Sequence, residues 1–219
     1  MRRQSWLVYL FGLLIVGISL VAVYIVYLLM TTPQTESITI TPDTAFNGIT
    51  AIEPPLLMSD FTLTNQHNEP IRLRDLSGKP ILITFGFTSC PDICPFTLGE
   101  MRSIHEALAD NADDINFVFI SVDGERDTPD TLRDYFDLLR VDTFLIGMTG
   151  TPDSVRQLGE EYGVNFIYDE ADDSGNYGVT HTAGMFLLDE NQNWIRRYTY
   201  GMQASLIIED IQQFFAGDV

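Results

Sequence analysis

The chain contains two cysteines, Cys90 and Cys94, which lie four positions apart in the segment Cys-Pro-Asp-Ile-Cys-Pro. They follow an apolar run, 81–87, that predicts a buried strand, and Pro95 is favourable in the first turn of a helix. If a helix begins at Cys94, the two sulfur atoms lie on the same side of its first turn. The positive end of the helix dipole lowers the pKa of a thiol there and favours the thiolate. This pair can therefore exchange electrons or bind a soft metal ion.

Two structural interpretations of the cysteine pair are less favourable. A disulfide across so short a loop removes little conformational entropy from the unfolded chain. A structural zinc site needs four ligands, typically two cysteine pairs, and the sequence has no further cysteine. A functional role for Cys90 and Cys94 is therefore the preferred interpretation.

The pattern of apolar residues predicts the elements that surround the dithiol. Continuous apolar runs indicate buried strands, and the Thr-Pro-Asp segments at 128–130 and 151–153 indicate two helix starts. The expected strands are 61–64, 71–73, 81–87, 116–122, 144–148, 184–188 and 194–199, and the expected helices begin at 94, 128 and 151, with a last amphipathic helix through 207–215. This order predicts an α/β fold with a central mixed sheet and helices on both faces.

One of the three histidines is a candidate for joining the dithiol. His67 lies in a polar turn, and His105 lies about three helical turns beyond Cys94. His181 ends a loop that leads into strand 184–188, which in a thioredoxin-like sheet is the neighbour of the dithiol strand. It can then reach the sulfur atoms as a ligand, and its alternative role as an ordinary surface histidine stays open. Two thiolates and one imidazole suit copper, the cuprous ion especially.

Carboxylates also lie near this edge of the predicted sheet. Asp123 follows strand 116–122, and ligand sites in α/β folds are built at such strand ends. A turn or capping role is the alternative for Asp123 and for Asp127. The acidic run 169–173 is typical of a solvated loop.

The N-terminal segment predicts a membrane anchor. Residues 6–30 carry no charge, and about 25 helical residues span roughly 37 Å, more than the roughly 30 Å of a hydrocarbon core. No small-x-small cleavage pattern follows, so an uncleaved anchor is preferred to a removed signal peptide. Because Arg2 and Arg3 precede the apolar run, we expect the N-terminus in the cytoplasm and the rest of the chain outside. The expected location is a bacterial cell membrane.

The remaining sequence predicts a tether and one domain. Residues 31–55 are rich in Thr and Pro and indicate a flexible tether, and residues 56–219 suffice for a single core. The formal net charge of the 219-residue chain is −19, and it has a single lysine. Nucleic acid is therefore excluded as a partner, because almost nothing could neutralise its phosphates.

Three segments together resemble the Sco/SenC family. They are Phe-Gly-Phe-Thr-Ser-Cys-Pro-Asp-Ile-Cys-Pro at 85–95, Ser-Val-Asp-Gly-Glu-Arg-Asp-Thr-Pro at 121–129 and Val-Thr-His-Thr at 179–182. The similarity extends from about Phe61 to the last predicted helix, and the predicted anchor agrees with it. The combination is highly specific, although no single segment is.

The resemblance implies a thioredoxin-like fold and copper delivery to the dinuclear copper site in subunit II of cytochrome c oxidase. It implies that Cys90, Cys94 and His181 are the copper ligands and that Asp123 influences the site from nearby. A copper donor or a thiol reductant is the further expected partner. Gly124 stands where the family often has proline, which predicts a looser turn after Asp123.

Two functional classes stay open at this stage. The first is a metallochaperone, a binding protein without turnover. The second is a thiol–disulfide oxidoreductase that keeps the cysteines of the target copper site reduced, with Cys90 and Cys94 as its redox pair. A peroxidase of the peroxiredoxin type is weakly supported, because it needs a threonine three positions before the attacking cysteine, where Phe87 stands.

Overall fold

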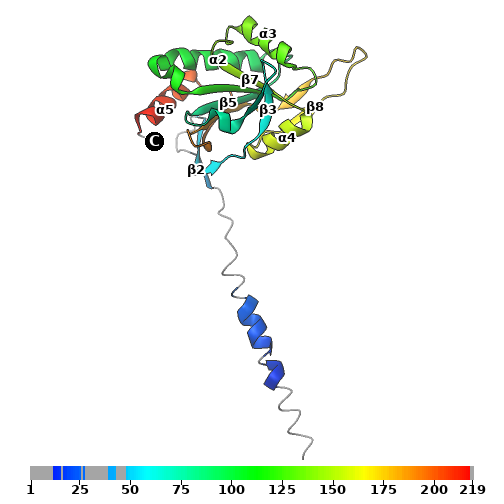
Figure 1. Ribbon diagram of the computed structural model, residues 1–219, viewed down its shortest axis with the longest axis vertical. Coiled ribbons are helices and arrows are strands. Elements are labelled where there is room, and N and C mark those ends of the chain that lie inside the picture. Colours follow the sequence, from blue (N-terminus) through cyan, green and yellow to red (C-terminus); the bar gives the residue numbers. More distant parts are fainter. Residues whose placement is uncertain (1–11, 16, 26, 28–38, 43–47, 218–219) are drawn as a thin grey trace, which may run out of the picture. The chain divides into compact units, whose positions relative to one another are not determined.

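The computed structural model describes residues 12–15, 17–25, 27, 39–42 and 48–217 (Figure 1). The chain divides into two compact units, residues 1–37 and residues 38–219. Residues 12–15 and 17–25 of the first unit are helical. Within the described ranges, no helix combines the length and the apolar character that crossing a membrane requires. The expected anchor at 6–30 includes residues outside those ranges, and it stays a prediction.

The second unit is built on a nine-stranded mixed sheet in the order β1-β2-β11-β10-β5-β6-β7-β3-β4. Its strands are β1 (Thr39–Pro42), β2 (Ile49–Leu57), β3 (Thr62–Asn65), β4 (Pro70–Arg72), β5 (Ile81–Gly86), β6 (Asn116–Ser121), β7 (Leu145–Thr149), β10 (Gly184–Leu188) and β11 (Asn193–Thr199). The central strands β5, β6 and β7 run parallel, and the other neighbours are antiparallel. Two short strands, β8 (Phe166–Tyr168) and β9 (Val179–His181), form a separate antiparallel pair.

Side chains of the central strands alternate between two cores, as the pleat of a strand requires. Ile81 and Ile83 of β5 point to one face, and Leu82 points to the other. The first face is covered by α4 (Pro152–Glu161), and the second by α2 (Ile93–Leu108), α3 (Pro129–Leu139) and α5 (Ala204–Ala216). The expected α/β fold, with a mixed sheet between helices on both faces, is confirmed.

The starts of the helices follow local capping chemistry. The side chains of Thr128 and Thr151 accept hydrogen bonds from backbone N–H groups in the first turns of α3 and α4, and a proline follows each of them. Helix α2 begins at Ile93, one residue before the predicted start. Cys94 is therefore the second residue of α2.

The predicted tether is wrong for part of its length. Residues 49–55 belong to β2, which pairs with β1 on one side and β11 on the other. The Pro54–Pro55 pair belongs to the Pro-rich composition that predicted the tether, but it lies where the register between β2 and β11 shifts, and an irregular stretch of a ladder tolerates prolines. The predicted tether residues 31–38 and 43–47 lie outside the described ranges.

The turn after Asp123 is tightly packed rather than loose. The backbone N–H groups of Arg126 and Asp127 donate to the carbonyl oxygen of Asp123 at 3.1 and 2.9 Å. A Cβ atom at Gly124 would lie 1.7 Å from the carbonyl oxygen of Gly150. Glycine is therefore required by the close approach of two backbone segments.

We expect Gly124→Ala to lower the free energy of unfolding by roughly 1–3 kcal/mol, because the two loops would have to separate. Gly99→Ala is the matched control, since Gly99 lies within α2 and nothing lies within 4 Å of an added Cβ. The free energy of unfolding of Gly99→Ala should rise by about 0.5–1 kcal/mol. Urea unfolding of both variants measures the contrast, and equal stabilities would contradict the packing at Gly124.

Candidate metal centre

The dithiol lies in the connection between β5 and the first turn of α2. Cys90 is half-buried, whereas Cys94 is only 3% exposed, and both are free thiols. The backbone N–H of Cys94 donates to the sulfur of Cys90 at 3.4 Å. The backbone N–H of Cys90 in turn donates to the carbonyl oxygen of Phe87 at 3.3 Å. The sulfur of Cys90 therefore lies at the N-terminus of the helix, as the spacing predicted.

His181 lies beside the dithiol. Strand β10 pairs with β5, as expected, so the segment before β10 reaches the edge of the sheet where Cys94 lies. The Nε2 atom of His181 is 3.9 Å from the sulfur of Cys94. His181 is the last residue of β9 and pairs with Phe166 of β8, whereas the sequence indicated only a loop.

Hydrogen bonding fixes which nitrogen of His181 is free. Its Nδ1 atom is 3.0 Å from the carbonyl oxygen of Thr182, which can only accept, so Nδ1 carries the hydrogen. Nε2 then presents its lone pair towards the sulfur of Cys94. Burial lowers the pKa of His181, which keeps the ring neutral and able to coordinate, although the hydrogen bond to Thr182 opposes that shift.

Burial also controls the thiol of Cys94. It raises the pKa of Cys94 well above its ordinary value, and a backbone hydrogen bond from Phe87 opposes the shift only in part. The expectation that the thiol pKa is lowered at the helix start is therefore wrong for Cys94, because desolvation by burial has the largest effect on this pKa. A metal ion that binds this sulfur must displace its proton.

The donor set fits a soft metal ion, with one rearrangement. A metal–sulfur bond is about 2.3 Å long and a metal–nitrogen bond about 2.0 Å, and their sum exceeds the 3.9 Å between the sulfur of Cys94 and the Nε2 atom of His181. One ion can therefore bind both atoms. Nevertheless, across the described ranges no three His, Cys, Asp or Glu side chains already converge as a metal-binding group. The sulfur of Cys90, now beside the Cys94 amide, would have to move to complete a three-ligand set.

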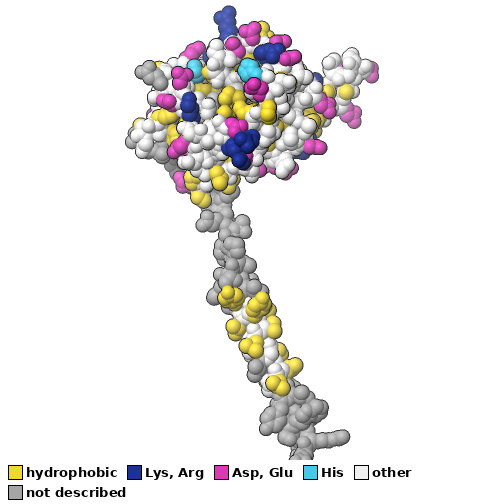
Figure 2. Space-filling model, viewed as in Figure 1, with side chains coloured by type: hydrophobic (Ala, Val, Ile, Leu, Met, Phe, Trp, Pro, Cys, Tyr) yellow, Lys and Arg dark blue, Asp and Glu magenta, His cyan; other side chains and the backbone are white. Residues whose placement is uncertain are grey.

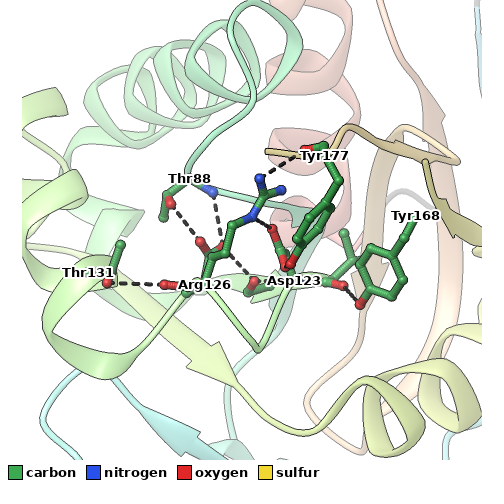
Figure 3. Close-up of polar contacts among 9 residues, drawn as sticks. Thr88, Asp123, Arg126, Thr131, Tyr168 and Tyr177 are labelled. Atoms are coloured by element: carbon green, nitrogen blue, oxygen red, sulfur yellow. Dashed lines mark hydrogen bonds and ion pairs between the residues drawn. The ribbon is translucent and has the colours of Figure 1, made fainter. Parts of the chain in front are cut away.

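Asp123 is bonded to protein groups rather than to the dithiol. It is fully buried, and it forms an ion pair with Arg126 while the hydroxyl of Tyr177 donates to its Oδ1 at 2.8 Å (Figure 3). Within residues 48–217, no hydrogen bond joins Asp123 to either cysteine or to His181. The predicted role of Asp123 near the metal stays a prediction, and its contacts indicate an indirect one.

The sequence left a turn or capping role open for Asp127, and the structure shows that this residue binds the dithiol loop. It is fully buried and accepts hydrogen bonds from the backbone N–H and the hydroxyl of Thr88 at 3.0 and 2.6 Å, and from Ser121 at 2.6 Å. Burial raises the pKa of Asp127, while these hydrogen bonds oppose the rise. Because Thr88 precedes Cys90 by two residues, Asp127 holds the dithiol loop against the end of β6.

The other two histidines do not approach the dithiol, as expected. His67 is exposed in the turn between β3 and β4, where its backbone N–H donates to Asn65. His105 stacks on Phe144, with ring centroids 4.2 Å apart.

Comparison with known proteins gives consistent matches. The family model described as SCO1/SenC matches residues 50–216. A protein named "SCO2-like protein" from Rickettsia felis is 35% identical over 151 residues, which cover 68% of this chain and 73% of the relative.

Solved structures match over the same region. The structure described as Bradyrhizobium japonicum ScoI with copper bound has a TM-score of 0.65 and 33% identity, and the match covers 72% of this chain and 98% of that one. Arabidopsis thaliana ScoI with copper bound gives a TM-score of 0.64 and 30% identity, with coverage of 72% and 99%. The expected thioredoxin-like fold is thereby confirmed.

The different burial of the two thiols predicts different reactivities. We expect Cys90, tested in a Cys94→Ser variant, to react with iodoacetamide at least about ten times faster at pH 8 than Cys94 in a Cys90→Ser variant. The rate for Cys94 should still be rising above pH 9, where an ordinary thiol with a pKa of about 8.5 levels off. Mass spectrometry measures both rates, and the two variants should react alike in guanidinium chloride. Equal rates in the folded proteins would contradict the burial of Cys94.

Proposed function

This chain belongs to the SCO1/SenC family, and on that premise we propose that it binds one copper ion through Cys90, Cys94 and His181. The observation that carries the proposal is the free Nε2 lone pair of His181, held 3.9 Å from the sulfur of Cys94. Two relatives of similar fold are described with copper bound. A set of two thiolates and one imidazole is soft, and it suits copper better than magnesium, calcium or manganese.

Each residue has a distinct task in this proposal. Cys94 is buried and His181 is half-buried, so these two ligands form the less exposed side of the site. Cys90 is the more accessible ligand, so a partner's donor atoms can approach the ion from its side. The hydrogen bond from Nδ1 to Thr182 orients the imidazole before the ion arrives.

The family membership supports a target as well as a cargo. We propose delivery to the dinuclear copper site of subunit II of cytochrome c oxidase, as the resemblance implies. A copper donor, or a reductant for the cysteines, is the second partner of this scheme. The chain would then act as a metallochaperone without turnover.

One observation favours a second candidate function, a thiol–disulfide oxidoreductase. Cys90 is half-buried, whereas Cys94 is buried. Such a difference in exposure suits a dithiol in which the accessible sulfur attacks a target disulfide and the buried sulfur then resolves the mixed disulfide. Oxidation of the pair would release two electrons and two protons to a target disulfide and abolish the copper site. Against this function, disulfide exchange does not require the imidazole that lies 3.9 Å from the sulfur of Cys94.

We also propose a single-pass anchor at residues 6–30, with the folded domain on the extracytoplasmic side of a bacterial cell membrane. Apolar side chains cover the visible face of the described helical residues 12–15 and 17–25 (Figure 2), and they are exposed, Leu13 by 70% and Val23 by 67%. A segment of this kind needs an apolar environment. The folded domain begins by residue 49 rather than at the predicted residue 56, because β2 is part of the sheet.

The His181→Ala variant separates the two functions. It should lose stable cupric binding and the sulfur-to-copper charge-transfer absorption, because two thiolates alone hold the cupric ion poorly and reduce it. Cuprous binding should weaken less, since two thiolates suffice for linear coordination of the softer ion. Anaerobic titration of the reduced full chain, followed by absorption spectroscopy, measures both.

The matched control is His67→Ala, since His67 is exposed and away from the dithiol; this variant should bind like the wild type. In cells, the His181→Ala strain should lose oxidase activity, and added copper should restore that activity at least partly if copper delivery is the defect. If His181→Ala instead keeps full oxidase assembly while Cys90→Ser or Cys94→Ser abolishes it, the oxidoreductase function replaces copper carriage.

The anchor predicts the side of the membrane on which the C-terminus lies. Alkaline phosphatase fused after Val219 should be active in a bacterial host, and a reporter that works only in the cytoplasm should be inactive at the same position. The reverse pattern would refute the proposed topology.

A further inference from the structure

The segment that leads to His181 is fastened to the end of β6 by a cluster of polar contacts. The Nη1 atom of Arg126 donates to the carbonyl oxygen of Tyr177 at 2.9 Å, and the Tyr177 hydroxyl donates to Asp123 at 2.8 Å (Figure 3). The guanidinium carbon of Arg126 lies 3.8 Å from the centre of the Tyr177 ring. Nearby, the hydroxyl of Tyr168 donates to the carbonyl oxygen of Val122 at 2.6 Å. We call the first three residues the Asp123–Arg126–Tyr177 clasp.

Besides the clasp, few contacts hold the segment that leads to His181: Val179 packs into the core on the α4 side, and the Thr182 N–H donates to the carbonyl oxygen of Asn165 at 2.9 Å. Residues 169–176 are all exposed, and the loop between β8 and β9 extends from the body of the domain (Figure 1). Apart from Tyr177, the described residues of that loop form their hydrogen bonds with one another, such as the one from the Asp169 N–H to the Gly178 carbonyl at 3.0 Å. Strand β9 has three residues and pairs only with β8, and so small a ladder is marginal without further packing.

The charge of Asp123 is already matched inside the clasp. The side chain is fully buried, and a buried carboxylate needs a partner charge and hydrogen bonds, which Arg126 and Tyr177 provide. Asp123 can therefore hold Arg126 and Tyr177 in place, whereas a contact with a metal ion would require it to give up one of them.

Arg126 also connects the clasp with the dithiol strand. Its guanidinium lies 6.0 Å from the centre of the Phe87 ring, and that ring meets the His181 ring edge-on, with centroids 5.9 Å apart. Phe87 directly follows β5 and precedes Cys90 by three residues. Arg126 thus contacts a residue of the dithiol loop and, through Tyr177, the strand that carries His181.

We propose that Arg126 and Tyr177 are positioning residues for His181, and that Asp123 affects the metal centre through them. This inference rests on the proposed copper-binding function. When the clasp is opened, β9 is free to move, and His181 leaves its place beside the sulfur of Cys94. The two cysteines keep their geometry, because Asp127 and the β5–α2 connection hold them independently.

The test uses Tyr177→Ala, which opens the clasp but leaves Asp123 paired with Arg126. The control is Tyr200→Ala, which removes another partly exposed tyrosine, one that packs on Phe96 of α2 and not on the β8–β9 hairpin. In the metal-free full chain, amide hydrogen exchange at residues 177–182 should become at least about tenfold faster in Tyr177→Ala. It should stay unchanged in Tyr200→Ala, and exchange in β5 should stay unchanged in both. Unchanged exchange at 177–182 would overturn the proposal.

Copper titration then asks whether the clasp acts through His181. Tyr177→Ala should weaken cupric binding by about 10–100-fold, and Tyr177→Phe, which keeps the ring on Arg126, should fall between it and the wild type. The double variant Tyr177→Ala/His181→Ala should bind the cuprous ion no more weakly than His181→Ala does. Additive losses in the double variant would mean a general structural role and overturn the proposal. A wild type that binds no copper would refute the proposed function, while exchange would still report whether the clasp holds β9.

Discussion

The parallel pairing of β5 with β6 is the constraint on which the whole site depends. Gly86 lies opposite Ser121 at the ends of the two strands, and the Val122 N–H continues the ladder by donating to Gly86 at 2.8 Å. Because the carboxyl ends of both strands therefore meet at one edge, the dithiol loop and the loop after β6 leave the sheet side by side. Strand β10, on the other side of β5, brings His181 to the same edge.

Burial gives the metal-free site a neutral character. The shifts of Cys94 and His181 both favour the uncharged form, and both arise from desolvation. A metal ion that binds both sulfur atoms displaces the two thiol protons. Two thiolates with a cupric ion then have no net charge, whereas two thiolates with a cuprous ion have a net charge of −1. The low-dielectric surroundings therefore favour ions that bind tightly enough to displace protons, which copper does better than the hard cations.

Much of this arrangement could be predicted from the sequence, where the causes are local. The buried strands show as continuous apolar runs, the starts of α3 and α4 follow from Thr128 and Thr151, and the cysteine spacing places the dithiol. What the sequence did not reveal depends on distant contacts. Strand β2 is hidden by Pro54–Pro55, and the thiol of Cys94 is governed by burial that no spacing reports. The packing of Gly124 on Gly150 joins two loops 26 positions apart, so neither segment indicates it by itself.

The short segment after β6 has a physical logic of its own. Two buried carboxylates, Asp123 and Asp127, lie four residues apart, and each is matched by different partners. Asp127 binds Thr88 and so holds the loop of the cysteines, whereas Asp123 binds Arg126 and Tyr177 and so holds the strand of the histidine. Two buried carboxylates this close would repel each other, and the coulombic effect of Asp123 indeed raises the pKa of Asp127. The ion pair of Asp123 with Arg126 and the three hydrogen bonds to Asp127 offset this repulsion. One segment after β6 thus contacts both the loop of the two cysteines and the segment that leads to His181, which together carry the proposed donor set.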